Sequence, residues 1–338
     1  MTKKINLGII GAGKISDIHL ETFSKNVNVS LVSIADVDIK LATEKAGKYG
    51  IGKICKNYLD IINDINIDAV DILLPHHLHA KASIEAIRKG KIVICEKPFV
   101  IKLSDAKKLI KETVLNKASM YLKHYLRYSS SHLEMKKMIN NGIIGKPYLI
   151  KCFYTCNSVK GMNDKKSWKG NIKKAGGGVL MDAGIHVVDF LQDIFGRPVS
   201  VMCECKQIFT KLKSKGEDLA IMNIEFPNNV MAEITCTSND SSYGFRWEKH
   251  VFGSKGSVHI IDYGKKHNEL LLYKGGIVVI KETENDWWNQ ANKNNLNDII
   301  DRIINEKNPI VSLETAYSGL KTILKAYDSS KKKKWLKV

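Results

Sequence analysis

Short apolar runs alternate with helical patterns over the first third of the chain. Each apolar run ends at glycine, proline or a charged residue, and apolar residues then recur three and four positions apart. Continuous apolar runs are typical of parallel strands that are buried on both faces. The pattern predicts an α/β fold with a doubly wound parallel sheet, its strands at residues 5–10, 29–34, 69–74 and 92–95 and its helices at 39–49 and 80–88.

The pattern changes after about residue 122, where strand-like runs outnumber helical ones. The segment Met231–Cys236 alternates, as in a sheet with one buried and one wetter face. Many strands with few helices predict a largely antiparallel open sheet in an α+β domain. We therefore expect a nucleotide-binding domain at 1–122 and a substrate-binding domain at 123–338, with a terminal helix at about 313–327. The expected strands of the second domain cover 148–155, 199–207, 219–226, 230–237, 250–252, 257–262, 270–273 and 277–280.

Composition places the chain among ordinary globular proteins. Its 338 residues suit two domains, and 44% of them are apolar and 26% charged. No run approaches the roughly 20 apolar residues of a membrane span, and the N-terminus runs into a strand without a signal-peptide pattern. We therefore predict a cytoplasmic protein. The seven cysteines are expected to be free thiols, and no metal site is predicted because Cys203 and Cys205 lack a second ligand pair.

The formal net charge of +18 is compatible with nucleic acid, an anionic substrate or a lysine-rich surface. The lysines are scattered along the chain, and only Lys331–Lys334 form a run. No nucleic-acid-binding motif accompanies them. We therefore predict that the partner is a small molecule, either neutral or anionic, and that the protein binds neither nucleic acid nor a membrane.

A glycine turn follows the first predicted strand. In Gly11-Ala12-Gly13-Lys14-Ile15-Ser16, Gly11 permits a tight turn and Gly13 lets the backbone approach a pyrophosphate at the helix N-terminus. Ser16 stands where the dinucleotide fingerprint has its third glycine. Asp36 ends the second strand, roughly 20 residues further on, where an acidic residue binds the ribose hydroxyls. A carboxylate there favours NAD, because it repels a 2′-phosphate.

Two polar segments follow later strands, at the edge of a parallel sheet where ligands bind. One runs from Pro75 through His76 to His79, and the other is Glu96-Lys97-Pro98. A polar loop with a helix start also explains the histidines. The second segment is more informative, because it places a charged pair directly at a strand end.

Helical periodicity in the second domain begins after Gly176-Gly177-Gly178 and ends near Gly196. A polar stripe on this helix consists of Asp182, His186, Asp189 and Asp193. Such a stripe usually faces solvent. In this lysine-rich chain, however, the stripe contains no lysine, and the glycines allow close packing against a ligand or a neighbouring domain.

Taken in order, Gly11-Ala12-Gly13, Asp36, the segment from Pro75 to His79 and Glu96-Lys97-Pro98 resemble the glucose–fructose oxidoreductase / inositol dehydrogenase / rhizopine catabolism (Gfo/Idh/MocA) family. The resemblance implies a Rossmann domain, NAD as cofactor, and a homodimer or homotetramer formed through the open sheet. It implies that Lys97, Asp182 and His186 are catalytic. The cofactor-binding residues expected are Gly11, Gly13, Lys14, Ile15, Asp36, Pro75, His76, His79, Glu96 and Lys97.

Trp168-Lys169 is similar to the family's tryptophan–arginine pair, with lysine in place of arginine. By position and resemblance, the expected substrate residues are Arg127, Tyr154, Asn157 and Trp168. Exchanging arginine for lysine removes the planar two-pronged contact that a guanidinium makes. The family pattern therefore carries over to this pair only in part.

Oxidation of a hydroxyl needs a base, a hydride acceptor and a group that stabilises the developing alkoxide. We predict that His186 is the base, Lys97 stabilises the oxygen and Asp182 orients the substrate or the lysine. The predicted activity is hydride transfer between a sugar, sugar derivative or polyol hydroxyl and nicotinamide. Two alternatives stay open. NAD-assisted glycoside cleavage without net redox would use the same residues differently, whereas a non-catalytic regulatory protein that binds NAD or sugar would have no chemical need for Lys97, Asp182 and His186 together.

Overall fold

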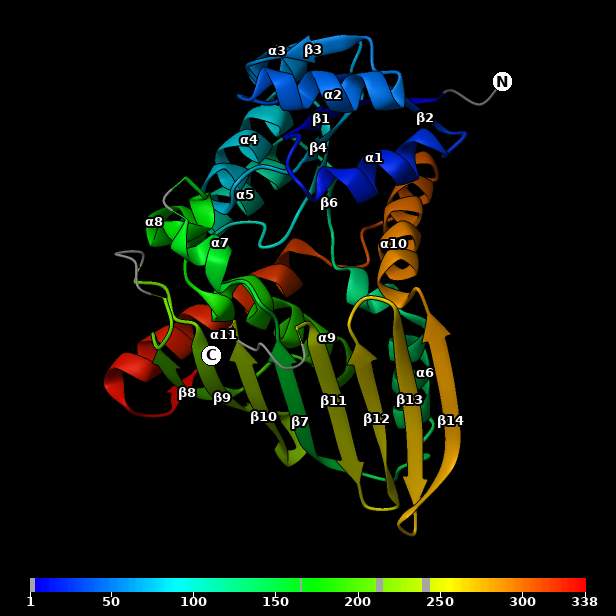
Figure 1. The fold of residues 1–338 in the computed structure, drawn as a ribbon, viewed down its shortest axis with the longest axis vertical. Helices are drawn as coiled ribbons and strands as arrows, with labels where there is room; N and C mark the ends of the chain where they lie inside the picture. Colours follow the sequence, from blue (N-terminus) through cyan, green and yellow to red (C-terminus); the bar gives the residue numbers. More distant parts are fainter. Residues whose placement is uncertain (1–3, 165, 211–214, 239–243) are drawn as a thin grey trace. The chain divides into compact units, whose positions relative to one another are not determined.

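Figure 1 shows the fold in a computed structural model, which describes residues 4–164, 166–210, 215–238 and 244–338. The chain forms two compact units. The first contains Met1–His124 together with Asn292–Ala316, and the second contains Tyr125–Ala291 together with Tyr317–Val338. The division predicted from the sequence does not include the return of Asn292–Ala316 to the first unit.

The first unit is built on a six-stranded parallel sheet in the order β3-β2-β1-β4-β5-β6. This confirms the predicted doubly wound sheet. The strand order reverses between β1 and β4, which makes the carboxyl ends of these strands the expected ligand site. The strands are β1 (Ile5–Ile10), β2 (Val29–Ala35), β3 (Lys53–Cys55), β4 (Ala69–Ile72), β5 (Ile92–Cys95) and β6 (Met120–Leu122).

Helices connect these strands and complete the core of the unit. They are α1 (Ser16–Ser24), α2 (Ile39–Tyr49), α3 (Leu59–Ile62), α4 (His76–Arg88), α5 (Leu103–Leu115) and most of α10 (Trp287–Ile304). Helix α4 begins four residues before the predicted start, because Pro75 sets the turn that leads into it. Leu296 and Ile299 of α10 share one apolar cluster with Leu20 and Phe23 of α1. A late segment of the chain thus covers the helix that follows the glycine turn.

The second unit is built on a nine-stranded sheet in the order β14-β13-β12-β11-β7-β10-β9-β8-β15. Among the described strands of this sheet, β7 and β10 pair in parallel and the other neighbours pair antiparallel, so the prediction of a largely antiparallel sheet is confirmed. In β10, Ala232 and Ile234 are buried while Met231 and Glu233 are exposed, as the alternation predicts. The strands are β7 (Pro147–Thr155), β8 (Ser200–Lys206), β9 (Leu219–Phe226), β10 (Val230–Thr237), β11 (Arg246–Gly253), β12 (Gly256–Tyr263), β13 (His267–Lys274), β14 (Ile277–Asn285) and β15 (Leu336–Lys337).

Helices of the second unit pack on this sheet through a mixture of apolar and polar contacts. Helix α6 contacts β12 and β13, and Ser329 of α11 accepts the Cys203 N–H of β8 at 3.1 Å. The helical elements are η1 (Tyr125–Tyr128), α6 (Ser130–Asn140), α7 (Val159–Asn163), η2 (Trp168–Gly170), α8 (Ile172–Ala175), η3 (Leu180–Gly184), α9 (Ile185–Phe195), η4 (Pro227–Asn229) and α11 (Leu313–Lys332). Within the described part of the chain, no helix is both long enough and apolar enough to cross a membrane.

Candidate functional site

The turn between β1 and α1 is shaped for the close approach of a ligand. Gly11 has a φ of +108°, and a Cβ added there would lie 2.7 Å from the Leu73 carbonyl oxygen. Only glycine fits this position. A Cβ added to Gly13 meets no atom within 4 Å, so this side of the turn is open. A tight turn with an open face at a helix N-terminus fits the phosphates of a dinucleotide.

Ser16, which replaces the third glycine, braces the turn. Its Oγ donates to the Gly13 carbonyl at 2.8 Å and accepts from Lys45 Nζ at 2.8 Å. Lys45 also donates to the Gly13 carbonyl at 3.0 Å and pairs with Asp17 at 2.9 Å. The sequence gives no signal for Lys45, because the residue lies in α2 among other polar side chains.

The Asp36 carboxylate reaches this same turn. Its Oδ2 accepts the Ala12 N–H at 2.7 Å and its Oδ1 accepts the Asp38 N–H at 2.9 Å. A carboxylate keeps further lone pairs after two such bonds, so Asp36 can also accept hydrogen bonds from ribose hydroxyls. Nearby, Lys14 is exposed and Ile15 is half-buried. The turn therefore fits NAD as predicted.

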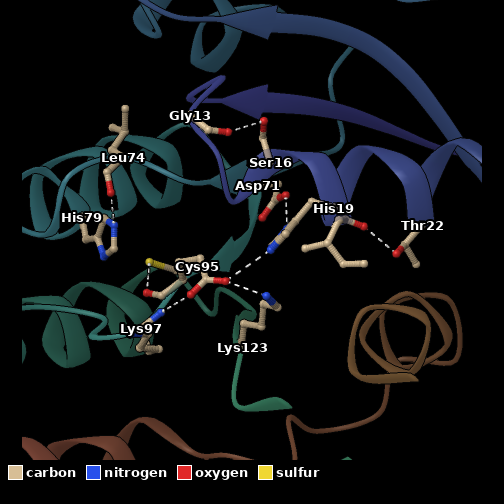
Figure 2. Close-up of polar contacts among 12 residues, drawn as sticks. Gly13, Ser16, His19, Thr22, Asp71, Leu74, His79, Cys95, Lys97 and Lys123 are labelled. Atoms are coloured by element: carbon tan, nitrogen blue, oxygen red, sulfur yellow. Dashed lines mark hydrogen bonds and ion pairs between the residues drawn. The ribbon is translucent and has the colours of Figure 1, made fainter. Parts of the chain in front are cut away.

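In the histidine segment after β4, His79 is fixed by contacts with the backbone. His79 Nε2 lies 2.6 Å from the Leu74 carbonyl (Figure 2). Its Nδ1 lies 2.8 Å from the Pro98 carbonyl. Both ring nitrogens thus contact backbone carbonyls, and the cofactor-binding role that the resemblance implies for His79 stays a prediction. Burial lowers the pKa of His79, against the effect of these two hydrogen bonds. His76 is buried, its ring 5.8 Å from that of His79, and Pro75 precedes it at the helix start.

Glu96 and Lys97 lie directly after β5, at the carboxyl end of the sheet. Glu96 Oε1 accepts from Lys123 Nζ at 2.7 Å, and Glu96 Oε2 accepts the Lys97 N–H at 3.1 Å (Figure 2). Burial opposes ionisation of Glu96, but the Lys123 charge and a hydrogen bond from His19 hold its pKa well below the ordinary value. Glu96 is therefore a buried anion whose carboxylate accepts a hydrogen bond from the backbone N–H of Lys97. The predicted cofactor-binding role of Glu96 stays a prediction.

In the second unit, Asp182 lies in the π-helical turn Leu180–Gly184 and His186 lies one turn later in α9. Glu217 fixes the start of this segment by accepting the Gly178 and Leu180 N–H groups, each at 2.9 Å. Burial raises the pKa of Glu217. A Cβ on Gly178 would lie 1.9 Å from the Glu217 carbonyl oxygen. The glycines thus allow close packing within the unit itself.

Aromatic rings surround His186, which is 8% exposed. The ring centroids of Tyr125 and Trp247 lie 5.2 and 6.1 Å from the imidazole centroid, and Tyr154 lies 5.0 Å from Trp247. Burial raises the pKa of Tyr154 well above its usual range. Of the predicted substrate residues, Tyr154 therefore belongs to the surroundings of the histidine. The sequence reading missed Tyr125 and Trp247, which alternation along the chain marks only as core positions.

Asp182 has a basic partner in the preceding segment. Lys169 Nζ lies 2.5 Å from Asp182 Oδ2 and 5.6 Å from the centroid of the Trp168 ring. The charge of Asp182 raises the pKa of Lys169, although burial opposes this. Lys169 thus contacts both the Asp182 carboxylate and the Trp168 ring, and the substrate role of Trp168 stays a prediction. Asn157, by contrast, is exposed just beyond the end of β7.

Arg127 is paired with two carboxylates of the polar stripe. Its Nε and Nη2 donate to Asp189 at 3.0 and 2.7 Å, and its Nη1 donates to Asp193 at 2.8 Å. His132 Nε2 also lies 2.9 Å from Asp193. These contacts give Arg127 a scaffold role in this unit, and its role toward a substrate stays a prediction. The polar stripe thus has two parts. Asp182 contacts Lys169 and His186 lies beside aromatic rings, whereas Asp189 and Asp193 both bind Arg127.

The glycine turn, the acidic residue after β2 and the lysine after β5 define an NAD-binding oxidoreductase domain joined to a second α/β domain. Comparison with protein families identifies it more closely. Residues 5–124 match "Oxidoreductase family, NAD-binding Rossmann fold" and residues 136–338 match "Oxidoreductase family, C-terminal alpha/beta domain". The chain belongs to the GFO_IDH_MocA oxidoreductase family. The predicted family, cofactor NAD and oxidoreductase class are confirmed.

Proteins similar to this chain include inositol dehydrogenases and a levoglucosan dehydrogenase. The chain is 26% identical to myo-inositol 2-dehydrogenase of Thermotoga maritima over 75% of this chain and 74% of that protein. It is 25% identical to scyllo-inositol 2-dehydrogenase (NAD(+)) of Bacillus subtilis over 92% and 90%. The structure of a levoglucosan dehydrogenase in complex with NADH and levoglucosan superposes with a TM-score of 0.89 at 21% identity, covering 99% of this chain and 100% of that chain.

Proposed function

We propose that this protein oxidises a hydroxyl of a sugar, sugar derivative or polyol, with NAD as the hydride acceptor. Its relatives include two inositol dehydrogenases and a levoglucosan dehydrogenase. The observation that carries the proposal is the environment of His186. The imidazole lies among Tyr125 and Trp247, one helical turn from Asp182. Aromatic rings suit the apolar faces of a sugar ring, and a carboxylate suits its hydroxyls.

His186 is the proposed base, because an imidazole changes protonation near neutral pH and can take the hydroxyl proton. Lys97 is proposed to stabilise the oxygen as negative charge develops on it. Asp182, held by Lys169, orients the substrate hydroxyls. NAD, when bound, supplies the hydride acceptor, and Gly11, Gly13, Ser16, Lys45 and Asp36 shape or brace its binding turn. That Lys97 and His186 serve one hydroxyl is itself part of this proposal.

The test is a panel of myo-inositol, scyllo-inositol, levoglucosan and their phosphorylated or carboxylated analogues, incubated with NAD and followed by NADH absorbance. His186→Ala is expected to lower kcat by about 10²-fold or more, with the affinity for NADH unchanged in a fluorescence titration. Unchanged turnover would contradict the assignment of the base. Bond cleavage without NADH accumulation would favour glycoside cleavage, and NAD binding without turnover on any compound would favour a regulatory protein.

Three narrower expectations remain part of the proposal. The net charge of +18 favours an anionic sugar over a neutral one. A homodimer or homotetramer formed through the open sheet follows from the resemblance to the family, and light scattering of the purified protein tests it. The cytoplasmic location stays a prediction from the sequence.

A further inference from the structure

Four charged or ionisable side chains form a buried network that includes the glutamate of the Glu-Lys-Pro segment. They are His19, Asp71, Glu96 and Lys123, and Figure 2 labels His19, Asp71 and Lys123. His19 Nδ1 lies 2.7 Å from Asp71 Oδ2, and His19 Nε2 lies 3.3 Å from Glu96 Oε1. Lys123 donates to the same Glu96 oxygen at 2.7 Å. The exposed fractions of His19, Asp71, Glu96 and Lys123 are 0%, 0%, 8% and 2%. Burial this complete requires that the charges compensate one another.

Protonation of the His19 imidazole completes the hydrogen bonds and balances the charges of this network. Both ring nitrogens of His19 face carboxylate oxygens, and only the imidazolium donates at both. With His19 protonated, two cations offset the two carboxylates; with His19 neutral, one negative charge stays uncompensated. Burial lowers the pKa of His19, but the charge of Asp71 and the hydrogen bonds to Asp71 and Glu96 outweigh burial and raise it.

The network connects the cofactor-binding helix to the proposed catalytic lysine. His19 belongs to α1, whose N-terminus forms the glycine turn, and Asp71 belongs to β4. Glu96 follows β5, and its second oxygen accepts the Lys97 N–H at 3.1 Å. The orientation of the Glu96 carboxylate therefore fixes the peptide from which the Lys97 side chain departs. On the far side of Lys97, His79 contacts the Pro98 carbonyl at 2.8 Å.

We propose that His19 is a positioning residue for Lys97, acting through its hydrogen bond to Glu96. The proposal rests on the catalytic role of Lys97 stated above. A purely structural histidine would serve only to compensate the buried Asp71. The two roles use different ring nitrogens, and this difference allows them to be separated.

Two amide variants divide the roles of the ring. In His19→Gln the amide nitrogen takes the place of Nε2 and keeps the donor to Glu96. In His19→Asn it takes the place of Nδ1 and keeps the donor to Asp71. The positioning role predicts that the asparagine variant is the more impaired in catalysis, and the structural role predicts that the glutamine variant is the less stable without a catalytic difference. Urea midpoints are recorded first for both.

The first readout is the rate at which an N-hydroxysuccinimide acetate acylates Lys97, measured by mass spectrometry with the exposed Lys4 as internal control. His19→Asn is expected to change the Lys97 rate by about threefold or more, and His19→Gln to stay within about twofold of the unchanged protein. In turnover, His19→Asn is expected to lower kcat about tenfold, with the NADH affinity and the KM for NAD unchanged.

Equal Lys97 acylation in both variants, or a larger change in His19→Gln, would overturn the proposal. If His19→Gln does not fold, the double variant His19→Gln/Asp71→Asn removes the uncompensated carboxylate and takes its place. The acylation readout does not depend on any substrate. Full turnover in a Lys97→Met variant would refute the catalytic role of Lys97. The effect of His19 on Lys97 acylation would still be measurable in the His19 variants, which retain Lys97.

Discussion

Replacing either glycine of the β1–α1 turn by alanine is predicted to affect a different property. Gly11→Ala should lower the stability of the fold, and Gly13→Ala should weaken the binding of NADH. Gly11→Ala places a Cβ 2.7 Å from the Leu73 carbonyl oxygen in a residue whose φ is +108°. The backbone strain costs about 1–3 kcal/mol, and relief of the clash costs about 1–3 kcal/mol more. The free energy of unfolding should therefore fall by roughly 2–6 kcal/mol.

Gly13→Ala should leave the fold intact, because its Cβ meets no atom within 4 Å. The methyl group instead occupies the open side of the turn, where a pyrophosphate would approach. The affinity for NADH should therefore weaken by about tenfold or more, which corresponds to roughly 1.4 kcal/mol. Gly50→Ala is the matched control for strain alone, since Gly50 ends α2 with a φ of +68° and its Cβ also meets nothing within 4 Å.

Urea midpoints and NADH fluorescence titrations of the three variants test this. The difference between Gly11→Ala and Gly50→Ala measures the clash with Leu73 together with the additional backbone strain of a φ of +108° over one of +68°. Gly13→Ala with unaltered NADH affinity would refute the placement of the pyrophosphate. A Gly11→Ala midpoint no lower than that of Gly50→Ala would refute the packing argument.

Three further outcomes are expected. Arg127→Met should lower the free energy of unfolding by about 3–5 kcal/mol, because the buried Asp189 and the partly buried Asp193 both lose the guanidinium, with a small effect on KM; the exposed Arg197→Met is the control. Lys45→Met should weaken NADH binding about threefold or more by loosening the glycine turn, whereas the exposed Lys48→Met in the same helix should not. Burial opposes ionisation of Asp193, but a hydrogen bond from His132 and the Arg127 charge hold its pKa at about 2, below the ordinary 3.8. The resulting stability, about 2 kcal/mol, is present above pH 3.8 and is lost as the pH falls toward 2; in a urea–pH series, Asp193→Asn should lack this loss.

Local features of the sequence determined the framework of the cofactor site. The glycine turn, Asp36 and Glu96-Lys97 each follow directly from an apolar strand, and their placement needs only the rule that parallel strands end at one edge of a sheet. The four strands and two helices predicted in the first domain are all present, with α4 starting earlier than expected. Helical periodicity likewise identified the segment of Asp182 and His186, although its first turn is π-helical.

Tertiary structure alone decided which charged groups are free to act and which hold the fold. Arg127 and Asp189 are 62 residues apart in the chain, and His19 lies 52 residues from Asp71 and 77 from Glu96. No periodicity encodes such pairs, because helical and strand patterns report only contacts within a few residues. A buried ionisable group takes the partner that the fold brings within hydrogen-bonding distance, since leaving its charge uncompensated costs several kcal/mol, on the order of 3–5. For this reason the sequence predicted the residues proposed to react, and the folded chain revealed the buried partners His19, Lys45 and Arg127.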